Sequence, residues 1–99
     1  MASSLKVEAE VVNKGLVALA IENTLLETGK LTCDYVLDMI NKEYHSYLTD
    51  CYEHPEYLST VLKKLYGDSY IEIVKSINKQ LEEFSNKKSI GKFLEILSK

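Results

Sequence analysis

The 99-residue chain contains no arginine and no tryptophan, and it has only two cysteines, one proline and four glycines. A formal net charge of −3 argues against nucleic-acid binding as the main task, because phosphate neutralisation drives such binding. Two cysteines are too few for a disulfide framework, and no zinc-type Cys-x-x-Cys pair is present. The glycines form neither a phosphate loop nor a dinucleotide-binding fingerprint.

Long hydrophobic runs are also missing. The most apolar run, from Leu16 to Ile21, is far too short to span a bilayer, and residues 1–8 contain no signal-peptide core. We therefore expect a cytoplasmic protein with reduced thiols and no membrane association. A chain of this length, with a hydrophobic share of 45%, is typical of one folded domain.

Apolar residues recur at helical spacing along most of the chain, which predicts an all-α fold. The clearest stripe runs from Tyr70 to Phe84, and we expect the rest of the chain to pack around it. Gly67 and Asp68 before it are suited to ending one helix and starting the next. Other helices are expected at residues 7–28, 33–48, 55–66 and 90–97.

These elements predict a compact bundle of four main helices plus a short C-terminal helix. We expect one domain, residues 1–99, in which residues 1–6 are a loose N-terminus and residues 85–99 hold a peripheral short helix. Thr32 and Ser89 are suited to N-cap positions, and Pro55 suits the first turn of the third helix. Residues 85–88 are expected to form a polar break.

The helix expected at residues 7–28 is apolar over more than half of its circumference. Such a helix is buried on more than one side, which favours either a central helix or a dimer interface. We expect a homodimer that uses the first helix or the fourth, because association adds buried surface to a small core. Gly15 in this helix either permits close approach of another helix or is a tolerated weakness.

Residues 50–57 gather most of the side chains that could carry chemistry. Cys51 and His54 are weak candidates for metal ligands, which Cys33 and His45 could complete in principle. In the purely structural interpretation, Cys51 is a small core residue and His54 is a helix-start residue. We expect no catalytic residue, no cofactor and no metal, and a protein that is not an enzyme.

All seven tyrosines lie between residues 35 and 70. Tyrosine is favoured at protein interfaces, although several tyrosines can also edge a small core with their hydroxyls in water. Candidate interaction residues in and after the 50–57 segment are Tyr52, Glu53, His54, Glu56, Tyr57, Tyr66 and Tyr70.

The string Glu53-His54-Pro55-Glu56-Tyr57-Leu58, followed by the turn Gly67-Asp68-Ser69-Tyr70, resembles the Nitrosopumilus-type output domain of archaeal signal-transduction proteins. The resemblance extends from about Leu16 to Phe84. It implies a non-enzymatic domain that passes or receives a signal through contacts, and it supplies no catalytic residues for this chain.

The preferred hypothesis is therefore a non-enzymatic protein–protein interaction module in archaeal signal transduction or regulation. Its expected partners are a second copy of the chain and another protein. The alternative is a small DNA-associated transcriptional regulator that places one helix in a groove. A third hypothesis is a thiol or metal site around Cys51 and His54.

Overall fold

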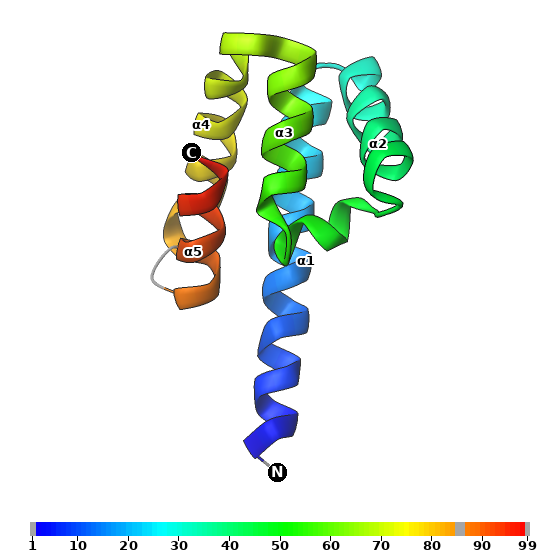
Figure 1. Ribbon diagram of the computed structural model, residues 1–99. Helices are drawn as coiled ribbons and strands as arrows, with labels where there is room; N and C mark the ends of the chain where they lie inside the picture. Colours follow the sequence, from blue (N-terminus) through cyan, green and yellow to red (C-terminus); the bar gives the residue numbers. More distant parts are fainter. Residues whose placement is uncertain (1, 85–86, 99) are drawn as a thin grey trace.

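Five α-helices and three short 3-10 helices form the part of the chain that the computed structural model describes, which is residues 2–84 and 87–98, with side chains from residue 10 onward (Figure 1). These residues contain no strand, so the predicted all-α class is confirmed. The α-helices are α1 (Ala2–Thr28), α2 (Lys30–Tyr44), α3 (Pro55–Tyr66), α4 (Tyr70–Leu81) and α5 (Lys88–Leu97). The 3-10 helices are η1 (Leu48–Tyr52), η2 (Gly67–Ser69) and η3 (Glu82–Phe84).

The longest helix, α1, organises the bundle. Its 27 residues correspond to about 40 Å of helix, close to the longest molecular extent of 43 Å. It packs against α2, η1, α4 and α5, and in Figure 1 it runs behind α3. The helix after Gly67 is therefore not the one around which the chain is built, because α4 packs mainly against α1 and less against α3 and α5.

All five α-helices contribute side chains to one hydrophobic core. Contributors at 0–1% exposure include Ile21 and Leu25 of α1, Val36 and Ile40 of α2, Leu58 and Leu62 of α3, Ile77 and Leu81 of α4, and Phe93 and Leu97 of α5.

The C-terminal helix α5 is not peripheral to this core, which corrects the sequence-based expectation. Its residues Ile90, Phe93 and Leu97 are at most 1% exposed. These positions lie three or four residues apart, so they share one face of the helix. That face packs mainly against α3, and α5 closes the side of the bundle next to α4.

Several helix ends differ from the predicted ones. α1 begins at Ala2, five residues before the predicted start at Val7; no proline interrupts these residues, and most are good helix formers. α2 begins at Lys30 rather than Cys33 because Gly29, with φ +154°, turns the chain directly after α1. It ends at Tyr44, because the left-handed backbone of the next residue, His45 (φ 51°), stops the helix before Leu48.

The third helix has its predicted ends, whereas the fourth ends earlier than predicted. Pro55 opens α3 as predicted, and Gly67 follows its last residue. The α-helical hydrogen bonding of α4 ends at Leu81, and η3 continues the chain to Phe84. Of the predicted polar break, Ser85 and Asn86 lie outside the described residues. Within the described part of the chain, no helix is both long enough and apolar enough to cross a membrane.

Candidate interaction surface

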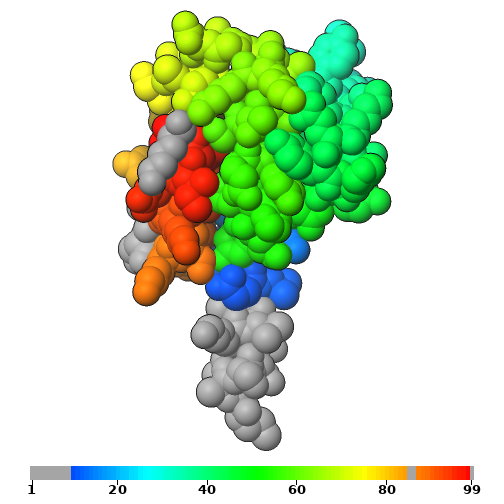
Figure 2. All heavy atoms as spheres, in the orientation of Figure 1, coloured from blue at the N-terminus to red at the C-terminus, as the bar shows by residue number. Residues whose placement is uncertain are grey.

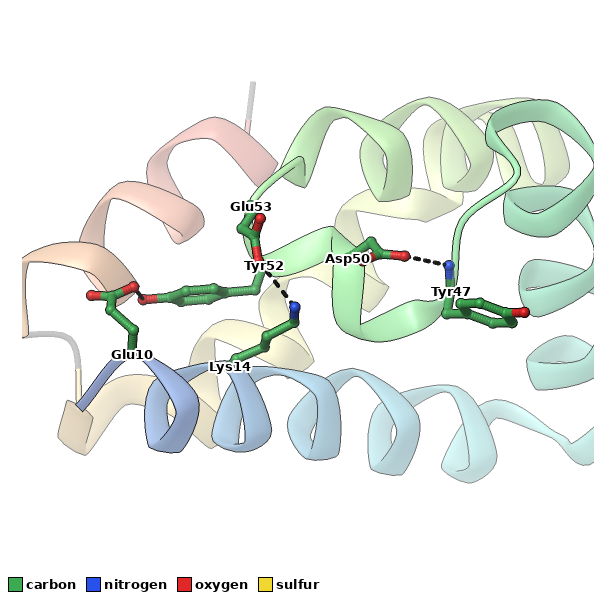
Figure 3. A network of polar contacts seen from close by, with 6 residues as sticks. All are labelled: Glu10, Lys14, Tyr47, Asp50, Tyr52 and Glu53. Atoms are coloured by element: carbon green, nitrogen blue, oxygen red, sulfur yellow. Dashed lines mark hydrogen bonds and ion pairs between the residues drawn. The ribbon is translucent and has the colours of Figure 1, made fainter. Parts of the chain in front are cut away.

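The segment from Asp50 to Tyr57 joins η1 to α3 and faces α1. Cys51 is fully buried and Tyr52 is only 9% exposed. Figure 3 shows the Tyr52 ring extending toward α1, where its hydroxyl donates a hydrogen bond of 2.8 Å to Glu10 Oε2. Tyr52 therefore holds η1 on α1 and is not available to a partner, which corrects its place among the candidate interaction residues.

Polar side chains of the same segment also bind within the molecule. Lys14 Nζ on α1 donates to Glu53 Oε1 at 3.0 Å, and Asp50 Oδ2 accepts a 2.8 Å hydrogen bond from the backbone N–H of Tyr47 (Figure 3). The Asp50 contact caps the start of η1. The Lys14–Glu53 pair is partly exposed, so it positions the segment more than it stabilises the fold.

Three aromatic rings form a stack at the start of α3. The rings of Tyr44 and Tyr57 are 4.1 Å apart between centroids, and those of His54 and Tyr57 are 4.6 Å apart. His54 Nδ1 also lies 3.3 Å from Glu56 Oε1. The stack joins the end of α2 to the start of α3. The exposed candidates His54 and Glu56 thus have local partners, which favours a structural role for this turn.

The remaining tyrosine candidates lie at the corner between α3 and α4. Tyr66 and Tyr70 are half-buried and pack against the core. The ammonium group of Lys63 lies 5.1 Å from the centroid of the Tyr70 ring, within the range of a cation–π contact. These two rings therefore support the α3–α4 corner, as in the interpretation that tyrosines edge the core.

No metal-binding cluster forms among the described residues. Cys51 lies inside the core, whereas His54 lies at the surface beside Glu56 and Tyr57. Both cysteines, Cys33 and Cys51, are buried free thiols. The weak metal candidates of the sequence therefore do not converge on one point.

A small groove between α1, η1 and α5 is the best-formed hollow near the 50–57 segment. At about 260 Å³ it is below the usual range for small-molecule sites, roughly 300–1,000 Å³. Its polar lining includes Glu53, Lys92 and Glu10, whose carboxylate accepts hydrogen bonds from Tyr52 and from Ser89 Oγ at 3.1 Å. Ser89 is not the N-cap of α5, which is Lys87; its hydroxyl instead joins α5 to α1.

Burial raises the pKa of the Cys51 thiol from 9.0 to about 12, and the nearby carboxylates of Asp50 and Glu56 add to the effect. The neutral thiol is therefore favoured in the folded state. Its contribution to the free energy of unfolding is fully present below pH 9. As the pH rises from 9 toward 12, only the unfolded chain releases this proton. Stability is then lost at about 1.4 kcal/mol per pH unit.

We expect Cys51→Ala to be less stable than the parent chain at pH 8, and also to lose stability less steeply above pH 9. Urea unfolding at a series of pH values from 8 to about 10.5 measures both slopes. Tyr52, whose pKa is also raised by burial, is present in both chains and serves as the internal reference. Equal slopes above pH 9 would contradict the assignment to Cys51.

The side of α1 that points away from the core is the surface least accounted for by contacts within the chain. Val12, Leu19 and Leu26 are 54%, 56% and 46% exposed and stand seven residues apart. Leu16 is half-buried and Gly15 and Asn23 are exposed on the same side. We call this surface the outer α1 face: Val12, Gly15, Leu16, Leu19, Asn23 and Leu26.

The opposite side of α1 is equally apolar. Val17, Ile21 and Leu25 on it are fully buried. The wide apolar band predicted for this helix thus consists of two faces. One face packs in the core and the other is exposed to solvent. Sequence reasoning expected a dimer helix here but did not single out the residues of the outer α1 face. Their seven-residue spacing is the signal that could have found them.

These observations define an all-α bundle with an exposed apolar helix face. No family model, no curated protein and no solved structure matches the chain.

Proposed function

We propose that this protein is a non-enzymatic helical protein–protein interaction module that binds through the outer α1 face. The observation that carries the proposal is the row of exposed Val12, Leu19 and Leu26 along one helix. Exposed apolar side chains that gather on one side of a molecule, rather than being scattered singly, mark interaction sites. An amphipathic helix face is also a common recognition element between proteins.

The chemistry of the outer α1 face favours a protein partner over nucleic acid. The face contains no lysine, so it offers no cation to a phosphate backbone. Lys14, its nearest basic neighbour in sequence, pairs with Glu53 on the other side of the helix. A role in signalling belongs to the proposal through the resemblance alone. The buried free thiols of Cys33 and Cys51 support a cytoplasmic location, where thiols stay reduced.

Site-specific photo-crosslinking tests the proposal. A photoreactive phenylalanine derivative would replace Leu19 in the full chain, expressed in the native organism, and crosslinked products would be identified by mass spectrometry. The matched control carries the same group in place of Lys75, an exposed residue on α4. We expect a discrete protein adduct from position 19 and none from position 75. Absence of an adduct at position 19, or the same adducts from both positions, would refute the proposal.

A further inference from the structure

The outer α1 face has the spacing of a coiled-coil seam. Val12, Leu19 and Leu26 occupy one heptad position, and Leu16 and Asn23 occupy the position four residues after Val12 and Leu19. These are the d and a positions of a heptad repeat. We propose that the face pairs with the outer α1 face of a second copy of this chain. This inference rests on the proposed function and names its partner.

The heptad pattern extends over the whole of α1. In sequence, Leu5 stands seven residues before Val12 and Ala9 seven before Leu16, so eight a and d positions run from Ala2 to Leu26. Seven of the eight are apolar, and sustained a and d repeats indicate helix pairing. The exception is Asn23. A single Asn at an a position is a known means of specifying register and oligomeric state.

The shape of the outer α1 face favours a helix as its binding partner. Gly15 lies on the outer α1 face with open space where a side chain would stand, which allows another helix to approach closely. No member of the outer α1 face is charged, and the exposed Glu22 and Glu27 lie beside it at the flanking g and e positions. A repeat of this kind is complementary to itself, and a two-fold dimer uses the same surface on both subunits.

The area of the seam fits a dimer of moderate strength. A helix about 40 Å long and roughly 10 Å wide presents roughly 400 Å² in projection, or roughly 800 Å² for two copies. Accessible area exceeds projected area, because side chains project from the helix surface. The total approaches the roughly 1,200 Å² at which specific interfaces begin.

Light scattering after size exclusion, from about 1 µM to about 1 mM, tests the inference on the full chain. We expect a concentration-dependent dimer, and we expect Leu19→Glu to raise its dissociation constant about 100-fold, because each copy then loses a leucine from the seam and gains a charge. The matched control is Ile71→Glu, since Ile71 is 45% exposed on α4. It should leave the dimer intact, and it also tests the alternative of a dimer through the fourth helix.

The variants are chosen so that failure to fold and failure to dimerise can be distinguished. Leu19 is exposed, so Leu19→Glu should fold, and circular dichroism checks this; Leu26→Glu provides a second variant with the same expected effect. A monomer at all concentrations overturns the inference, as does a dimer that Ile71→Glu disrupts and Leu19→Glu leaves unchanged. If the chain is monomeric but position 19 crosslinks to a different protein, the inference fails and the proposed function stands.

Discussion

Replacing Phe93 by alanine is expected to lower the free energy of unfolding by about 3–5 kcal/mol. The Phe93 side chain is 1% exposed and lies in the core together with Ile90 and Leu97. Its removal leaves a cavity between α5 and the helices that α5 covers, because the neighbouring side chains can only partly fill the space. The loss is a large part of the total stability of a domain this size, about 5–15 kcal/mol.

The chain offers a matched control for this substitution, because it contains one other phenylalanine. Phe84, in η3, is only half-buried at the edge of the core. Phe84→Ala should therefore cost clearly less than Phe93→Ala, in proportion to the smaller apolar area that it removes from water. Chemical denaturation of both variants measures the difference. Equal losses, or a loss below about 1 kcal/mol for Phe93→Ala, would contradict the docking of α5.

The second large effect separates the two faces of α1 through neighbouring residues. Leu25 is fully buried and Leu26 is 46% exposed. Leu25→Ala is expected to reduce the free energy of unfolding by about 2–5 kcal/mol, as usual for a core leucine. Leu26→Ala should cost less than about 1 kcal/mol when measured at low protein concentration, because the exposed site leaves no cavity.

The same pair should rank in the opposite order when self-association is measured. Leu26→Ala removes a member of the outer α1 face, so it is expected to weaken the dimer, whereas Leu25→Ala leaves that face unchanged. Both substitutions put the same residue at adjacent positions of one helix, which cancels differences in helix propensity. Similar effects of the two variants on unfolding would show that α1 is not buried on one side only.

The local signals in the sequence predicted much of the fold. Periodic apolar residues were sufficient for the all-α class, because each stripe needs a helix to bring it onto one face. Pro55 and Gly67 set the limits of α3, since one lacks the N–H that the first turn does not need and the other has a backbone (φ 56°) that other residues rarely adopt. The C-terminal end of α4 was less predictable, because η3 continues its helical pattern with a different hydrogen-bond spacing. The end of α2 was missed because the left-handed backbone of His45 has no clear signal in the sequence.

The candidate site was less accessible to sequence reasoning. The residues around Tyr52 and His54 form the most distinctive segment of the sequence. In the structure, Tyr52 binds Glu10, and His54 contacts Tyr57 and Glu56. Those partners lie on α1 or in the next turn, and composition does not reveal which tyrosine hydroxyl finds a carboxylate. The seven-residue spacing of the outer α1 face was visible in the sequence, but the sequence did not show that this face of the helix stays uncovered.

By itself, the sequence determined that this chain forms amphipathic helices and where most of them begin, because these properties depend on neighbours within a few residues. Only the tertiary structure decided that α1 rather than α4 is the organising helix, and that α5 belongs to the core. It also decided which half of the wide apolar band on α1 is covered. A helix that is apolar on two sides can bury either one, and the choice follows from the packing of α2, η1 and α4 against it.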